Sequence, residues 1–101
     1  MFDMKNLTRL KTLDAEAPEA MWAFRAFDEA AFADGALSAQ HKPLIAVAVA
    51  LTTQRPYCIE LHNKAARAAD ATDVQLAEAA LVAAAIRAAG AVMHATHLFV
   101  G

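Results

Sequence analysis

The alanine-rich stretch from Asp73 to Ala89 places the strongest constraint on the fold of this 101-residue chain. Alanine has the highest intrinsic helix propensity, and Thr72 followed by Gln75 matches the pattern of a capping box. The stretch therefore predicts a long helix that begins at Asp73. Gly90 either ends or kinks this helix, and residues Ala91 to Leu98 then form a last helical segment.

Prolines and turn residues mark the ends of the other expected helices. These helices run from Pro18 to Asp34, from Lys42 through Leu51, and from Pro56 to about Ala69. The apolar run 44–51 also fits a buried strand, but helix is favoured because no other segment offers it a strand partner. Residues 1–13 show no clear period and are interpreted as an N-terminal arm. We expect residues 1–101 to form a single all-α domain of about five to six helices.

The composition predicts that copies of this domain pack against one another to complete the hydrophobic core. Hydrophobic residues make up 58% of the chain, but many of them are alanines, which pack closely without burying large apolar areas. A monomer of this kind would be thinly stabilised, so an obligate homo-oligomer is expected. Trp22 and Phe32 fall outside the apolar stripe of the helix at 18–34 and are candidates for contacts with a subunit partner.

Charge and cysteine content argue against several classes of function. The net charge is −2 and lysines and arginines do not cluster, which argues against nucleic acid or an anionic membrane as the main partner. A single cysteine cannot form an internal disulfide. The longest uninterrupted apolar runs, 44–51 and 79–86, are shorter than the roughly 20 residues that span a bilayer, and the first residues do not resemble a signal peptide. A cytoplasmic protein without a membrane partner is therefore expected.

The only cysteine, Cys58, lies near the start of the helix that Pro56 opens. His62 follows four residues later, so a helix places the thiol and the imidazole on the same face. Arg55 precedes Cys58 by three residues, and a helix N-terminus with neighbouring cations favours the nucleophilic thiolate form of a cysteine. Cys58 and His62 are therefore the candidate catalytic pair, with Arg55 in support. The alternative is a small buried cysteine without chemistry.

Two neighbours of this pair are weaker candidates for a supporting role. Glu60 lies on a different face of the same helix and is better explained as solvated or interfacial than as a catalytic acid. Tyr57 either donates a hydrogen bond to a substrate oxygen or packs through its ring, and packing is the commoner use.

His94 and His97 form an H-x-x-H pattern in the last helical segment. Together with His62 and Cys58 they would supply four acceptable zinc ligands. Two histidines one turn apart are more often a pair at a helix C-terminus, where the macrodipole favours them. We therefore expect neither a metal nor another cofactor, and His94 is kept as a supporting residue.

The segment Pro-Tyr-Cys-Ile-Glu-Leu-His at residues 56–62 follows an apolar helix and precedes Lys64-Ala-Ala and the alanine-rich helix. This arrangement, over roughly residues 37–99, resembles the carboxymuconolactone decarboxylase and alkylhydroperoxidase D (AhpD)-like family. The resemblance implies an AhpD-like all-helical domain that assembles as a homotrimer or a homohexamer, in agreement with the composition.

In the peroxidase branch, the resemblance implies an upstream Glu, then C-x-x-C, then a His four residues after the second cysteine. Cys58 matches that second cysteine and His62 matches the histidine. Arg55 occupies the position of the first cysteine, and Pro43 occupies that of the glutamate. A two-cysteine cycle within the motif is thereby excluded. The resemblance implies a one-cysteine peroxidase and antioxidant reductase that acts on a small-molecule peroxide, with Cys58 resolved by an external thiol reductant or by Cys58 of another subunit.

Two other functions are compatible with the same resemblance. The decarboxylase branch implies a cofactor-free carboxy-lyase or isomerase acting on a lactone or related carboxylate. In that case His62 or His94 would move the proton and Arg55 would hold the carboxylate as a bidentate pair. The third possibility is a non-catalytic oligomer that keeps the scaffold without the activity.

Overall fold

The structure, a computed structural model, describes residues 2–99. Within this range the chain forms five α-helices and two short 3-10 helices, without a strand. In order they are η1 (Met4–Arg9), α1 (Leu10–Glu16), α2 (Pro18–Phe32), α3 (Lys42–Thr53), α4 (Pro56–Ala68), α5 (Asp73–Ala95) and η2 (Thr96–Phe99). The expected all-α fold is confirmed, and the apolar run 44–51 is helical as part of α3.

Local sequence signals place the starts of the helices that carry the candidate site. Pro18 and Pro56 each occupy the first position of their helix, and Pro43 occupies the second position of α3, where the missing N–H costs no intrahelical hydrogen bond. Gln54 ends α3 in the left-handed region with φ 55°, and the next residue, Arg55, is extended. The turn from α3 into α4 is therefore two residues long, which sets the two helices side by side.

The capping box predicted for α5 is present. The Thr72 hydroxyl accepts a hydrogen bond from the Gln75 backbone N–H at 3.1 Å, and the Gln75 side chain accepts one from the Thr72 N–H at 3.0 Å. The helix does not end at Gly90 but continues to Ala95. A single glycine costs only about 1 kcal/mol relative to alanine, and the alanine-rich residues on both sides propagate the helix through it.

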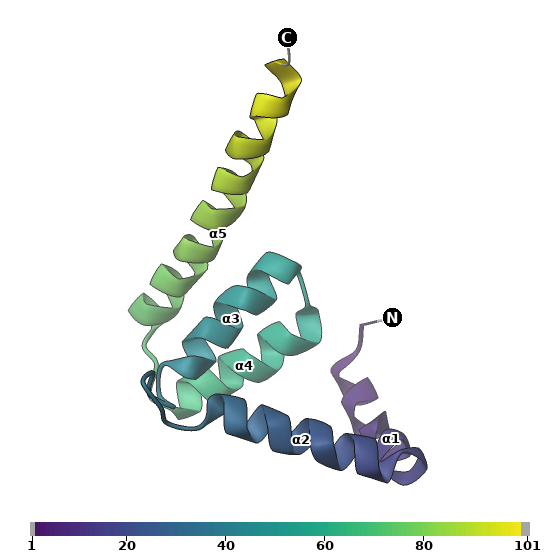
Figure 1. Cartoon of the computed structure of the whole chain (residues 1–101). Helices are drawn as coiled ribbons and strands as arrows, with labels where there is room; N and C mark the ends of the chain where they lie inside the picture. Colours follow the sequence, from purple (N-terminus) through teal and green to yellow (C-terminus); the bar gives the residue numbers. More distant parts are fainter. Residues whose placement is uncertain (1, 100–101) are drawn as a thin grey trace.

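The N-terminal arm is largely helical, a feature that its sequence did not indicate. Residues 4–16 form η1 and then α1, and the change from 3-10 to α geometry within thirteen residues hides any single period. A salt bridge of 3.0 Å between Arg25 and Asp14 links α1 to α2. Figure 1 shows α1 at the far end of α2, from which η1 returns toward the start of α4.

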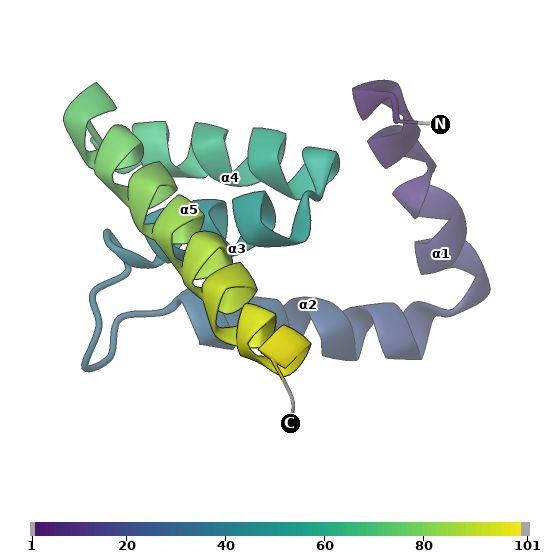
Figure 2. The same ribbon diagram turned by 90° about the horizontal axis from the view of Figure 1, so that it is seen from above.

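The small core lies where α3 packs between α4 and α5. Its buried apolar side chains are Val47 and Ala50 of α3, Ala66 of α4 and Ala83 of α5. Three of these four are alanines, so the helices approach closely while burying little apolar area. Figures 1 and 2 show α3 and α4 side by side, with α2 passing along one end of the pair and the C-terminal half of α5 projecting away from them.

The chain exposes more surface than a compact monomer of its size. Its accessible area is 7845 Å², whereas a folded monomer of this mass exposes about 5,500 Å². The radius of gyration is 17.1 Å, against about 13 Å for a compact domain of this length. Large apolar side chains of α5, among them Leu81, Val82 and Ile86, are more than 60% exposed.

By length and composition alone, Asp73–Phe99 is apolar enough to cross a membrane. It spans 27 residues, its best window has a mean hydropathy of 1.7, and only 6% of that window is buried within the chain. The uninterrupted apolar runs 44–51 and 79–86 are short, as expected, but in α5 isolated polar residues interrupt a longer apolar helix. An interface helix of an oligomer has the same composition.

Candidate active site

Cys58 is the third residue of α4, directly after Pro56 and Tyr57. The thiol is free and half-buried. Arg55 is the N-cap residue of the same helix and is exposed. The first turn of a helix carries N–H groups without intrahelical partners and the positive end of the macrodipole. The local fold therefore places Cys58 in the first turn of a helix, as the sequence predicted.

A surface pocket of about 350 Å³ brings the three predicted residues Arg55, Cys58 and His62 together. It lies between α3 and α4, and its other lining residues are Ala46, Val49, Ala50 and Thr53 of α3. Its lining is almost entirely apolar. A second, more polar opening of about 460 Å³ reaches Cys58 from the side of the α3–α4 turn. Cys58 therefore lines two openings on the surface.

The imidazole of His62 stacks on the ring of Phe32. The ring centroids are 5.5 Å apart and the planes differ by 13°. Phe32 is the last residue of α2 and is half-buried, and within the chain it packs on the candidate site. Its expected contact with a subunit partner stays a prediction. Trp22, the other residue expected to face a partner, is 76% exposed. The stack orients the imidazole beside the pocket that contains Cys58.

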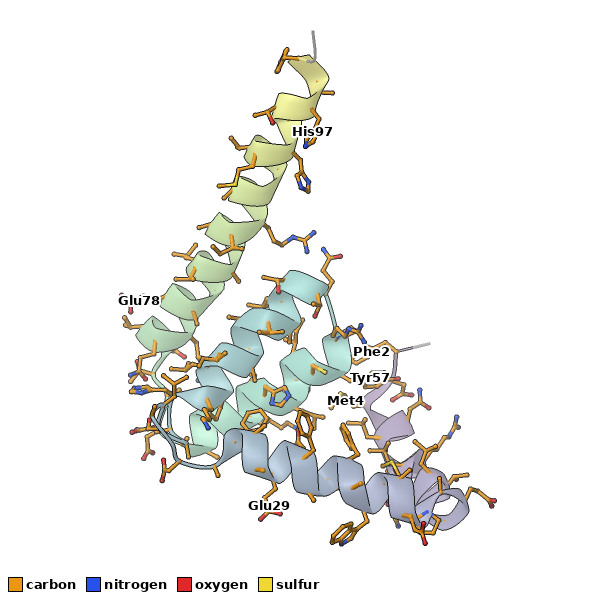
Figure 3. The ribbon with its side chains drawn as sticks, in the orientation of Figure 1. Phe2, Met4, Glu29, Tyr57, Glu78 and His97 are labelled. Carbon is orange, nitrogen blue, oxygen red and sulfur yellow. The ribbon has the colours of Figure 1, made fainter. Side chains whose placement is uncertain are left out.

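The hydroxyl of Tyr57 is engaged by the N-terminal segment. It accepts hydrogen bonds from the Asp3 backbone N–H at 3.2 Å and from the Asn6 side-chain amide at 3.0 Å. The Phe2 ring lies 4.7 Å from the Tyr57 ring, and Figure 3 shows Phe2, Met4 and Tyr57 gathered at the first turn of α4. Tyr57 therefore anchors the N-terminal arm next to the cysteine, and both its ring and its hydroxyl serve that contact.

The remaining candidates lie away from the pocket. Glu60 is exposed on α4 and does not line either opening to Cys58. His94 is also exposed, and its ring lies 6.0 Å from that of His97 in an edge-to-face arrangement. Figure 3 shows His97 in η2, just beyond the C-terminal end of α5 and far from α4. Within residues 2–99, no three His, Cys, Asp or Glu side chains come close enough to hold a metal ion.

Two contributors to the site carried no clear signal in the sequence. Phe32 precedes His62 by thirty residues, and only its position outside the apolar stripe of α2 marked it as unusual. Lys42 lies at the start of α3, and its ammonium group donates a hydrogen bond to the Ala33 carbonyl at the end of α2. Both contacts depend on how the loop 33–41 returns the chain from α2 to α3.

The site combines a half-buried thiol at a helix start with an imidazole one turn later, on an all-α scaffold. This combination defines a class of protein, and comparison with known sequences agrees with it. The family model described as the carboxymuconolactone decarboxylase family matches residues 18–100. The chain belongs to this family, which includes peroxidases and decarboxylases.

A curated protein from Paracoccus denitrificans, named uncharacterized protein 4 in cox locus, is 55% identical to this chain over 73 residues. The matched region covers 72% of this chain and 66% of the relative. The chain therefore spans slightly less than two thirds of the length of that relative.

Two solved structures share the fold. A protein from Methanobacterium thermoautotrophicum superposes with a TM-score of 0.80 at 38% identity, covering 85% of this chain and 97% of the other. The apo form of a carboxymuconolactone decarboxylase family protein from Legionella pneumophila superposes with a TM-score of 0.78 at 35% identity, covering 81% and 73%. The AhpD-like fold expected from residues 37–99 is thereby confirmed for most of the chain.

Proposed function

We propose that this protein is a thiol-dependent hydroperoxide reductase of the one-cysteine type, with Cys58 as the nucleophile. The observation that carries the proposal is the pocket between α3 and α4, which gathers Cys58, His62 and Arg55 at the start of α4. A partly accessible thiol beside an imidazole and a guanidinium is the arrangement that activates a cysteine.

The proposed reaction proceeds through a sulfenic acid. The Cys58 thiolate attacks one oxygen of a hydroperoxide ROOH, an S–O bond forms and the O–O bond breaks. The alkoxide leaves and takes a proton as the alcohol ROH. A first external thiol then attacks the sulfenic sulfur, releasing water and forming a mixed disulfide, and a second thiol releases Cys58 and the external disulfide. One hydroperoxide is thus reduced while two thiols are oxidised.

His62 and Arg55 have distinct roles in this scheme. His62 accepts the thiol proton as a base and returns it to the departing alkoxide as an acid. Arg55 stabilises the negative charge on the thiolate and on the oxygen that leaves. The apolar walls from α3 favour an organic hydroperoxide over hydrogen peroxide.

The test measures both the intermediate and the turnover. The native oligomer is treated with cumene hydroperoxide and dimedone, and mass spectrometry then reports the adduct of the sulfenic acid. Peroxide consumption is followed in parallel with dithiothreitol as the reductant. We expect both signals in the wild type, none in Cys58→Ser, and a fall of about 10²-fold or more in turnover for His62→Gln.

Arg55→Leu tests whether the charge of Arg55 affects the reaction more than the other exposed charges of α4 do. It should lower the rate of dimedone adduct formation by about tenfold or more, because the pocket that contains the reacting sulfur loses its cationic side chain. Glu60→Gln is the matched control on the same helix and should retain the wild-type rate. Wild-type protein that forms no adduct at Cys58 and consumes no peroxide would refute the peroxidase proposal.

The lyase alternative has its own observation in its favour, since Arg55 is exposed at the mouth of the pocket and can hold a carboxylate. It predicts turnover of a lactone or carboxylate substrate that survives Cys58→Ser and is lost in Arg55→Leu. A stable oligomer that turns over neither substrate class would instead support a non-catalytic role.

We propose further that the protein acts as a homo-oligomer. The excess accessible area of roughly 2,300 Å² over a compact monomer is in the range that obligate interfaces bury. Among the helices, α5 carries the most exposed large apolar side chains, and we propose that such an interface covers them. Light scattering should give the mass of a homotrimer or homohexamer, and a monomer that is stable at micromolar concentration would contradict the proposal.

A further inference from the structure

One face of α3 runs past Cys58 and continues beyond its pocket. The pocket of about 350 Å³ at Cys58 and a neighbouring pocket of about 270 Å³ both include Ala46 in their lining. The residues of α3 that line the two pockets are Lys42, Ile45, Ala46, Val49, Ala50 and Thr53. Their spacing of three and four residues places them on one face of the helix. We call this face and the side chains that flank it the α3 groove.

The stacked rings of Phe32 and His62 flank the middle of the α3 groove. Phe32 lines the pocket nearer Lys42, and His62 lines the pocket that contains Cys58. Because α4 returns alongside α3 after a two-residue turn, Cys58 lies beside the C-terminal half of α3. The order along the groove is therefore an ammonium group, an apolar stretch with the ring stack, and then the thiol.

Charge is confined to the two ends of the α3 groove. The lining of both pockets is almost entirely apolar apart from Lys42 at one end and the residues around Arg55 at the other. From Lys42 to Ala50, which lines the pocket that contains Cys58, the helix rises about 12 Å. A ligand that matches this pattern has one anionic head and an aliphatic chain that spans this distance.

We propose that the α3 groove binds an aliphatic carboxylate, with the carboxylate on the ammonium group of Lys42 and the chain directed along Ile45 and Val49 toward Cys58. Lys42 is half-buried and donates one hydrogen bond to the Ala33 carbonyl. An ammonium group has three N–H donors, so further donors remain for the carboxylate. The apolar stretch accommodates the chain by the ordinary hydrophobic effect.

The same geometry adds a substrate class to the proposed function. If Cys58 reduces hydroperoxides, its substrate class is an aliphatic carboxylate that carries the hydroperoxide group on its chain, at the distance from the head that reaches Cys58. This statement about the substrate rests on the proposed function. Binding of the carboxylate does not, because it needs no turnover.

Calorimetric titration of the native oligomer with decanoate tests the binding. We expect saturable binding with one site per chain, and a loss of affinity of about tenfold or more in Lys42→Met, which keeps the aliphatic stem and removes the charge. Lys42→Arg keeps the charge and should retain binding. Lys64→Met, which removes an exposed lysine of α4, is the matched control and should bind as the wild type does. Equal decanoate affinity in Lys42→Met and the wild type would overturn the proposal.

A second variant tests the apolar stretch without touching the ammonium group. Ile45 is 46% exposed, so Ile45→Glu leaves the packing of α3 largely intact while placing a carboxylate in the groove. It should abolish decanoate binding, and unchanged binding would place the ligand elsewhere. Decanol lacks the charge and should bind equally to the wild type and to Lys42→Met.

Protection of Cys58 locates the bound ligand. Saturating decanoate should slow alkylation of Cys58 by iodoacetamide, whereas hexanoate, which is too short to reach the thiol, should not. Decanoate that binds without slowing alkylation would overturn the proposed position. A fall in the mass of the oligomer on addition of decanoate would show that a second copy of the chain covers the groove, and would also overturn it. If decanoate protects Cys58 from alkylation but the wild-type protein consumes no peroxide, the proposed function is refuted and the proposed binding of the carboxylate is not.

Discussion

The stack between Phe32 and His62 predicts a measurable coupling energy. Its centroids are 5.5 Å apart with nearly parallel planes, within the range where aromatic pairs contribute about 0.5–1.5 kcal/mol beyond the area they bury. Phe32→Leu keeps an apolar side chain of similar reach, and His62→Gln keeps a polar one. The double-mutant cycle formed by these two variants should give a coupling energy of about 1 kcal/mol in the free energy of unfolding.

Urea denaturation at one fixed protein concentration measures this cycle, because the stability of an oligomer depends on concentration. Phe27→Leu is the matched control on α2, since Phe27 is 72% exposed. Paired with His62→Gln, it should give additive effects. A coupling energy for Phe32 and His62 below about 0.3 kcal/mol, which is the additivity error of independent sites, would refute the reasoning that the rings stabilise each other.

Three other variants test the arm, the capping box and the interface. Tyr57→Phe removes the hydroxyl that anchors the N-terminal arm, so limited proteolysis should remove the arm faster than in the wild type; an unchanged rate would contradict the anchor. Thr72→Ala removes the capping hydrogen bond to Gln75 and should lower the free energy of unfolding by about 1 kcal/mol, or Tm by about 4–8 °C in a thermal scan. Leu81→Arg on the exposed face of α5 should lower the mass seen by light scattering while circular dichroism keeps the helical signal. A mass equal to that of the wild type would count against an α5 interface.

Local rules accounted for the helices that carry the thiol. A proline in the first turn starts α2, α3 and α4, and the capping box starts α5, because each signal acts within one turn of the chain. The pairing of Cys58 with His62 follows for the same reason, since residues four apart share a helix face in any fold. The helices of residues 4–16 were not predicted from the sequence, because two short segments of different pitch share no period.

Contacts between distant segments were not predictable in this way. The loop 33–41 sets the direction of α2 through three hydrogen bonds, in which the Asp34 carboxylate accepts from the Ala39 N–H, the Leu37 carbonyl accepts from the Gly35 N–H, and Lys42 reaches the Ala33 carbonyl. None of these bonds has a periodic sequence signature. They nevertheless decide whether Phe32 meets His62.

The sequence by itself determined that this chain is helical, where most of its helices begin, and that a single thiol shares a helix face with an imidazole. It did so because helix propensity, caps and i, i+4 spacing are properties of neighbouring residues. Only the tertiary structure placed Phe32 on His62, Tyr57 on the N-terminal arm and Lys42 at the end of the groove that leads to Cys58. Those contacts join segments far apart in the chain, and they depend on the loop geometry and close packing that set how the helices meet.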